Sequence, residues 1–191
     1  PAPVRAIMSD ENVRIDAFLG PSHVSVITGS KIYKELADEF KRPIAISGFE
    51  PLDIMASVLN LVRQQNAGTY EVYNEYARAV KEEGNVKAKE LIAKYFEPCD
   101  FVWRGLGEIA QSGMKLKDEF AYLDARVQFD CSVESAGESK ACICGQILRG
   151  LAKPTDCKVF GKVCNPQNPI GSCMVSSEGA CAAYFKYARV G

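Results

Sequence analysis

Short apolar runs alternate with helix-spaced apolar residues over the first part of the chain. Residues 15–19 and 43–47 are mostly apolar, which is typical of short buried strands. Residues 30–40 carry apolar side chains at helical spacing, and residues 52–66 show a second amphipathic helical pattern that ends near Gly68. Strand, helix, strand and helix joined by short links predict an α/β fold on a parallel sheet.

Turn and cap residues mark the ends of these elements. Ser30 is placed to cap the helix over residues 30–40, and Pro51 suits the first turn of the helix that follows. Two more helices are predicted over residues 70–82 and 86–96. Phe101–Trp103 is a candidate for a third strand.

The pattern weakens from about residue 110, and residues 132–140 are polar. We therefore predict a boundary near residue 130. An α/β domain over residues 1–130 would precede a small cysteine-rich module over residues 131–191.

Composition excludes some classes of function. The chain has 191 residues, of which 47% are hydrophobic and 25% charged, an ordinary globular balance. The net charge of −1 gives no basic footprint for nucleic acid. No apolar run approaches the ~18 residues of a membrane span, and no signal peptide opens the chain. We expect a cytoplasmic protein, and the opening Pro-Ala-Pro without an initiator Met suggests a fragment or a processed chain.

The eight cysteines are distributed unevenly. Only Cys99 lies in the first two-thirds of the chain. Seven crowd the remainder, namely Cys131, Cys142, Cys144, Cys157, Cys164, Cys173 and Cys181. A secreted disulfide scaffold would spread its cysteines over a small, loop-rich chain, so metal or redox chemistry ranks above structural disulfides here.

Cysteine spacing favours an iron–sulfur cluster over zinc. Zinc ribbons use cysteines about two to four residues apart, and the one close pair, Cys142 and Cys144, is too tight to be typical. Single, widely spaced cysteines among glycines and prolines suit a larger cubane cluster. Such a cluster needs four of the six cysteines from residue 142 to residue 181. The remaining two are either a thiol–disulfide couple fed by the cluster or buried, inert thiols.

Several stretches of the chain are distinctive enough to compare with a known family. The most specific is Ser-Ser-Glu-Gly-Ala-Cys over residues 176–181, preceded by Cys-Lys-Val-Phe-Gly-Lys-Val-Cys-Asn-Pro over residues 157–166. Further stretches are Asp-Ala-Phe-Leu-Gly-Pro-Ser-His-Val-Ser (16–25), Gly-Phe-Glu-Pro-Leu-Asp (48–53) and Trp-Arg-Gly-Leu-Gly (103–107). These stretches resemble the HypD family of [NiFe]-hydrogenase maturation factors, and the similarity runs through essentially all of the chain.

The resemblance implies a scaffold on which the Fe(CN)2CO unit of the hydrogenase is assembled. It implies two α/β domains with a [4Fe-4S] module, a HypC-type small chaperone and a HypE-type cyanide donor as partners, and an accessory role rather than a classified enzyme. The family's Cys-Gly-x-His-Thr and Gly-Pro-Gly-Cys-Pro-Val-Cys motifs are absent. The chain would thus hold Fe(CN)2CO only with the missing N-terminal half, whether its own or supplied by another chain. Ser22 also departs from the Gly that the family usually has before His.

The resemblance also implies roles for individual cysteines. Cluster ligands in the spacing C-x14-C-x6-C-x16-C fall on Cys142, Cys157, Cys164 and Cys181. Cys144 and Cys173 would then form the redox pair. Cys144 is two residues from Cys142, so the two could exchange places as ligand.

Three other side chains are candidates for the cleft between domains or for the cluster surroundings. His23 is the only histidine and follows a predicted strand end, where open α/β sheets place ligands, although a solvated side chain is the plainer alternative. Glu50 could orient a ligand or cap the next helix, and Glu178 could relay protons or be a surface acid. Trp103 and Arg104 are interpreted as a core aromatic with a snorkelling base.

Two alternative functions stay open. One is an independent iron–sulfur or thiol electron carrier, and the other is a structural zinc module on an α/β domain. Iron and acid-labile sulfide in an anaerobic preparation would exclude zinc. Binding to a HypC-type chaperone would distinguish the scaffold from the electron carrier.

Overall fold

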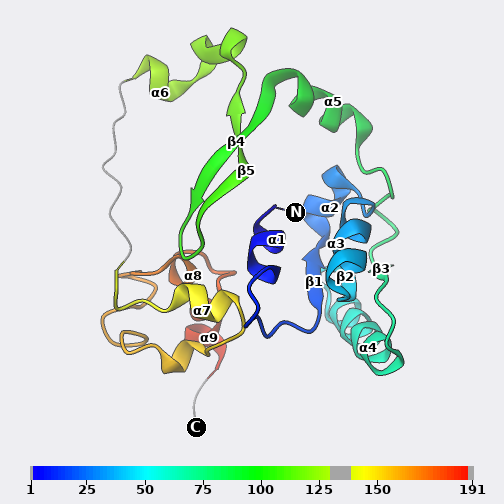
Figure 1. The fold of residues 1–191 in the computed structure, drawn as a ribbon, viewed down its shortest axis with the longest axis vertical. Helices are drawn as coiled ribbons and strands as arrows, with labels where there is room; N and C mark the ends of the chain where they lie inside the picture. The colour runs from blue at the N-terminus through cyan, green and yellow to red at the C-terminus, as the bar shows by residue number, and fades with distance from the viewer. Residues whose placement is uncertain (1, 130–138, 189–191) are drawn as a thin grey trace. The chain divides into compact units, whose positions relative to one another are not determined.

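The computed structural model describes residues 2–129 and 139–188 and divides the chain into two compact units (Figure 1). Unit 1 is built from residues 15–97, and unit 2 from residues 2–14 and from residue 98 onward. The boundary predicted near residue 130 falls at residues 130–138, which lie outside the described residues, as does Cys131.

A three-stranded parallel sheet forms the centre of unit 1. Its strands, in the order β1-β2-β3, are β1 (Phe18–Pro21), β2 (Ile44–Ser47) and β3 (Val72–Asn74). Ile44 lies opposite Phe18 on one side and Val72 on the other. All four residues of β2 are buried, because this strand is paired on both edges and covered on both faces. The predicted α/β fold with a parallel sheet is confirmed.

Four helices belong to unit 1: α2 (Ser22–Thr28), α3 (Ile32–Phe40), α4 (Pro51–Ala67) and α5 (Val86–Tyr95). The predicted helices over residues 30–40, 52–66 and 86–96 are confirmed, and α2 was not predicted. Pro51 occupies the first turn of α4, and Gly68 ends it in a left-handed conformation with φ 66°. The predicted cap is wrong, because α3 begins after Lys31 and has no side-chain cap. The carbonyl of Ser30 instead accepts a bond from the Tyr33 N–H.

The helix predicted over residues 70–82 is also wrong. The segment forms β3 and then a series of turns. The N–H of Glu75 donates to the Ile46 carbonyl (3.1 Å), and the Asn74 amide donates to the Val80 carbonyl (2.9 Å). Pairing with the buried central strand therefore overrides the helical spacing.

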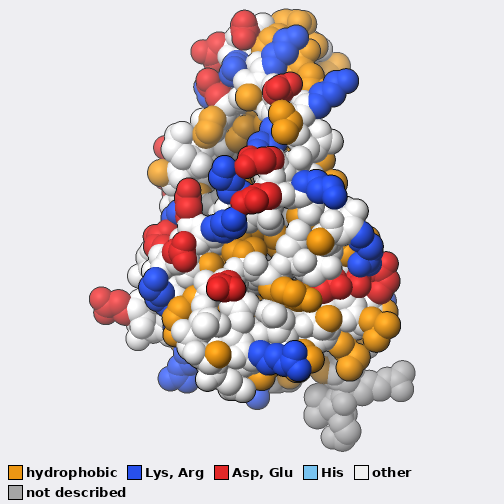
Figure 2. Space-filling model, turned by 90° about the vertical axis from the view of Figure 1, so that its right-hand side faces the viewer, with side chains coloured by type: hydrophobic (Ala, Val, Ile, Leu, Met, Phe, Trp, Pro, Cys, Tyr) orange, Lys and Arg blue, Asp and Glu red, His pale blue; other side chains and the backbone are white. Residues whose placement is uncertain are grey.

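Helix α4 turns a largely polar face toward the rest of unit 1. Its buried side chains are Asp53, Ser57, Leu61 and Gln64. Its exposed apolar side chains are Leu52, Ile54, Met55, Val58, Leu59 and Val62. On the face of the molecule drawn in Figure 2, hydrophobic side chains lie at the surface among charged ones. The amphipathic pattern predicted the helix correctly, but the buried face is the polar one.

Unit 2 begins with helix α1 (Ala2–Met8) and continues with a hairpin of β4 (Phe96–Trp103) and β5 (Gly107–Leu116). Phe101–Trp103 is a strand as predicted, but it pairs with β5 and does not join the parallel sheet. Short elements follow: η1 (Asp118–Leu123), α6 (Ala125–Gln128), α7 (Cys144–Leu148), η2 (Pro154–Asp156), α8 (Ser172–Val175) and α9 (Ala180–Tyr187). The Arg14 N–H donates to the Arg149 carbonyl (2.9 Å), which ties residues 2–14 to the segment after α7. Among the helices described, none is long and apolar enough to span a membrane.

Candidate functional site

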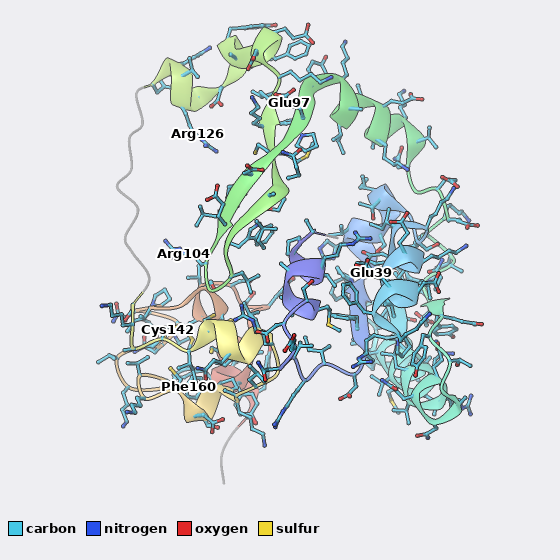
Figure 3. The ribbon with its side chains drawn as sticks, viewed as in Figure 1. Glu39, Glu97, Arg104, Arg126, Cys142 and Phe160 are labelled. Carbon is cyan, nitrogen blue, oxygen red and sulfur yellow. The ribbon has the colours of Figure 1, made fainter. Side chains whose placement is uncertain are left out.

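Six cysteines from separate short elements of unit 2 occur as free thiols. Cys142 precedes α7 and is half-buried, whereas the other five, Cys144, Cys157, Cys164, Cys173 and Cys181, are buried. Cys144, Cys164, Cys173 and Cys181 form one core with Met174 and Ala182. Cys142 and Phe160 pack against this core, and both are labelled in the α7–α9 region in Figure 3. Sulfur therefore occupies positions that aliphatic side chains fill in an ordinary core.

Glycine allows the chain to pass close to two of these cysteines, one at its backbone and one at its sulfur. A Cβ at Gly179 would lie 2.2 Å from the Cys173 carbonyl oxygen, so only glycine fits where the chain turns from α8 into α9. A Cβ at Gly171 would lie 2.4 Å from Cys142 Sγ. Both glycines belong to the loops that carry the cysteines, which explains the glycine-rich sequence around them.

Backbone groups fix two further thiols. The Ile170 N–H donates to Cys164 Sγ (3.4 Å), and the Cys157 thiol donates to the Ala141 carbonyl (3.8 Å). Cys99 lies on β4 and is not part of the buried group.

Cys144 and Cys173 are in direct contact. The backbone N–H of Cys173 donates to Cys144 Sγ (3.3 Å), and the Ser172 hydroxyl lies 3.2 Å from the same sulfur. A hydrogen bond from the Cys173 thiol, helped by Ser172, lowers the pKa of Cys144 to about 6. The same bond and burial raise the pKa of Cys173. The shared hydrogen bond therefore favours ionisation of Cys144 over ionisation of Cys173.

Burial opposes charge on the other thiols. It raises the pKa of Cys181 to about 12, with repulsion from Cys144 and Cys157 adding to the effect. Burial also raises the pKa of Cys142, and Cys144, Cys157 and Cys164 contribute repulsion there too. These sulfurs are thus close enough to repel one another as thiolates. Ionising them together requires a cation, which a bound metal centre supplies.

The cysteine donors can be compared with the needs of a single ion and of a cluster. Within residues 2–129 and 139–188, no group of three or more His, Cys, Asp or Glu side chains is placed to hold one metal ion. In a cubane each cysteine binds a different iron, so the four sulfurs need not converge on one point. Buried, soft thiol donors in glycine-rich loops fit that chemistry.

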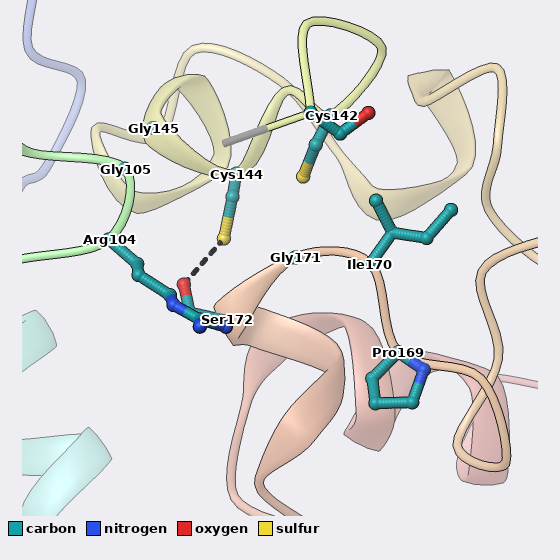
Figure 4. A pocket seen from close by; sticks show the side chains of 10 residues that line it. Arg104, Gly105, Cys142, Cys144, Gly145, Pro169, Ile170, Gly171 and Ser172 are labelled. Atoms are coloured by element: carbon teal, nitrogen blue, oxygen red, sulfur yellow. Dashed lines mark hydrogen bonds between the residues drawn. The ribbon is translucent and has the colours of Figure 1, made fainter. Parts of the chain in front are cut away.

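A cavity of about 160 Å³ opens beside Cys144 (Figure 4). Its lining includes Arg104, Ser139, Cys142, Cys144, Gly171 and Ser172. Arg104 lies at the turn between β4 and β5 and points toward Ser172 (Figure 4). A Cβ at Gly145 would lie 2.5 Å from the Gly105 carbonyl oxygen, so the hairpin turn rests directly on the start of α7.

Polar residues gather at the carboxyl ends of the strands in unit 1. His23 is exposed and stacks on Phe49, with ring centroids 5.5 Å apart. Arg78 pairs with Glu50 (2.9 Å) and with Asp53 (2.6 Å). Hydrogen bonds from Arg78 lower the pKa of Asp53, and those to Asp53 raise the pKa of Arg78. Glu50 stands at the cap position of α4, but its side chain makes no cap hydrogen bond and pairs with Arg78 instead.

Some of the predicted site residues lie away from the buried cysteines, and two residues that were not predicted lie beside them. Glu178 is exposed, and its backbone N–H bonds to the Ser176 hydroxyl (3.2 Å). Trp103 donates from its indole to the Ser112 hydroxyl (2.7 Å), within the hairpin. The sequence did not reveal that Arg104 and Ser172 flank Cys144; adjacency of Ser172 to a cysteine was the only signal.

The fold and the site define a class of protein: an α/β unit joined to a cysteine-rich C-terminal region with a thiol-lined core. The sequence model of the HypD family, described as the hydrogenase formation hypA family, matches residues 1–188. The chain belongs to this family, as its motifs predicted.

Named relatives agree with the assignment. The hydrogenase maturation factor HypD2 of Bradyrhizobium diazoefficiens is 54% identical over 178 residues, covering 93% of this chain and 47% of that protein. The hydrogenase maturation factor HypD of Cupriavidus necator is 47% identical over 196 residues, covering 99% of this chain and 52% of that protein. A putative hydrogenase expression/formation protein of Methanocaldococcus jannaschii is 43% identical over 188 residues, covering 98% and 52%. The chain therefore spans about half the length of these relatives.

Proposed function

We propose that this chain is the cysteine-rich half of a hydrogenase maturation scaffold and binds one [4Fe-4S] cluster. The observation that carries the proposal is the collection of six free thiols from Cys142 to Cys181, five of them buried. The proposed ligands are Cys142, Cys157, Cys164 and Cys181, with Cys144 able to replace Cys142. The relatives named as hydrogenase maturation factors support the wider role.

The remaining two cysteines supply a thiol couple. When bound, the cluster supplies one-electron transfer. Oxidation of Cys144 and Cys173 forms one Sγ–Sγ bond and releases two electrons and two protons, and reduction reverses this. The contact between their sulfurs and the Cys173 backbone supports this assignment.

The proposed assembly role requires other protein parts besides this chain. We propose that the Fe(CN)2CO unit is assembled only together with the other half of a HypD-length scaffold, in the cytoplasm. A HypC-type chaperone and a HypE-type cyanide donor would be its partners. The role is that of a redox-active scaffold rather than a classified enzyme.

Anaerobic reconstitution tests the ligand set. The native chain should bind about four iron and four sulfide per chain and show visible cluster absorbance. Cys157→Ala, Cys164→Ala and Cys181→Ala should each lose that absorbance, whereas Cys99→Ala, a matched control on β4, should keep it. A full cluster in any of the three variants would refute the ligand set.

Two further measurements separate the alternatives. Zinc without sulfide in the purified chain would favour a structural zinc module. An intact cluster with no binding to a HypC-type chaperone, tested with the other half present, would favour an independent electron carrier. An infrared CN or CO stretch in the isolated chain would contradict the need for the other half.

A further inference from the structure

The cavity beside Cys144 is lined by one proposed cluster ligand, Cys142, and also by Arg104, Ser139 and Ser172, which the cluster does not use. We infer that it admits a small thiol bearing a carboxylate to the Cys144–Cys173 couple, with Arg104 binding the carboxylate. This inference rests on the couple proposed above. It adds the class of the external reductant and the residue that selects it.

The two sulfurs of the couple differ in access. Cys144 lines the cavity, whereas Cys173 is not among its lining residues. Cys173 packs in the core with Met174 and Cys181. An external thiol can therefore reach Cys144, and Cys173 is the inner partner.

The cavity is suited to an anion. Arg104 is the only charged residue in its lining, beside the hydroxyl-bearing Ser139 and Ser172 and the thiols of Cys142 and Cys144. Within the described parts of the chain, Arg104 has no ion pair that would neutralise it. A guanidinium binds a carboxylate through paired N–H donors. The Gly105–Gly145 contact places the hairpin turn that carries Arg104 directly against α7.

The exchange step balances without another oxidant or reductant. The thiolate RS⁻ attacks Cys144 Sγ of the disulfide, forming a Cys144–S–S–R bond and releasing Cys173 as a thiolate that takes up a proton. A second RS⁻ attacks the sulfur of the bound R group, releasing RSSR and the Cys144 thiolate. Two electrons pass from two thiols to the disulfide.

The test compares two thiols on the oxidised, cluster-containing chain. The rate of disulfide reduction is measured with 3-mercaptopropionate, which carries a carboxylate, and with neutral 2-mercaptoethanol. Each variant is compared with the native chain for each thiol, so the intrinsic reactivity of the thiol cancels. Arg104→Gln should slow reduction by mercaptopropionate about fivefold, the size expected of a solvent-exposed charge pair, and leave the mercaptoethanol rate unchanged. Arg104→Lys should restore part of the loss.

Controls separate the possible failures. Arg126→Gln removes an exposed cation of α6 that does not line the cavity, and it should alter neither rate. Added salt should reduce the advantage of mercaptopropionate in the native chain only. Equal effects of Arg104→Gln on both thiols, or none on either, would overturn the inference while leaving the couple intact. Failure of Cys144 and Cys173 to form a disulfide on oxidation would overturn both the couple and this inference.

Discussion

The two units build their cores from different chemistry. In unit 1, Ile44, Ala45 and Ile46 of β2 are almost fully buried between two neighbouring strands and covering helices. In unit 2, the buried core consists mainly of cysteines, and three of its four, Cys144, Cys173 and Cys181, are carried by helices of four to eight residues. Helices that short are marginal by themselves. The difference teaches where each unit gains its stability: we expect apolar packing to stabilise unit 1, and the proposed cluster to stabilise unit 2.

The largest expected change in stability comes from a substitution in the apolar core of unit 1. Ile46→Ala removes a side chain with 0% exposure, and we expect it to destabilise unit 1 by about 3 kcal/mol. Ile54→Ala, on the exposed face of α4, is the matched control and should cost far less. Chemical denaturation followed by circular dichroism measures both. The iron content of unit 2 should not change, and its loss in Ile46→Ala would break the distinction between the units.

A smaller effect is expected where glycine meets sulfur. Gly171→Ala places a methyl group 2.4 Å from Cys142 Sγ, so one of them must move. We expect a cost of about 2 kcal/mol, together with reduced iron retention during gel filtration. Gly20→Ala in β1 is the control, since its Cβ would meet its nearest atom at an ordinary 3.5 Å. Full iron retention in Gly171→Ala would show that Cys142 is not a tightly held ligand and would favour Cys144.

The smallest effect is electrostatic and confined to unit 1. Arg78 lowers the pKa of Asp53, so the folded pKa lies below the unfolded value of about 3.9. The stabilisation is complete above the unfolded pKa and is lost as pH falls through the folded pKa. Asp53→Asn should therefore be less stable than the native chain at pH 7, and the two should converge in strong acid. A stability difference that does not change with pH would exclude this ion pair as its cause.

The spacing of apolar residues predicted most of the strands and helices of unit 1, because most of these elements bury one regular face or a whole short strand. It failed at β3, where Glu75 and Asn74 are fixed by bonds to Ile46 and Val80 that no local pattern reveals. It also could not tell which face of α4 is buried. The presence of polar Asp53 on the inner face depends on its ion pair with Arg78, 25 residues away.

The sequence predicted which residues form the cysteine site, but it did not predict which groups contact them. Spacing indicated which residues carry sulfur, and the family resemblance suggested how to divide them into ligands and a pair. The contact of Cys144 with Ser172 and the Cys173 backbone depends on the path of the chain between α7 and α8. The approach of Arg104 depends on two glycines, Gly105 and Gly145, that are 40 residues apart in the sequence. Neither of these contacts produces a periodic pattern in the sequence.

Hydrogen exchange before and after removal of iron compares the two units most directly. The anaerobic, cluster-containing chain is divided, one half is treated with an iron chelator, and peptides from both units are followed. Amides of α7, α8 and α9 should lose their protection when iron is removed, while those of β2 should keep theirs. Equal protection of α7, α8 and α9 with and without iron would contradict the account, because the sulfur core would then be stable without a metal centre.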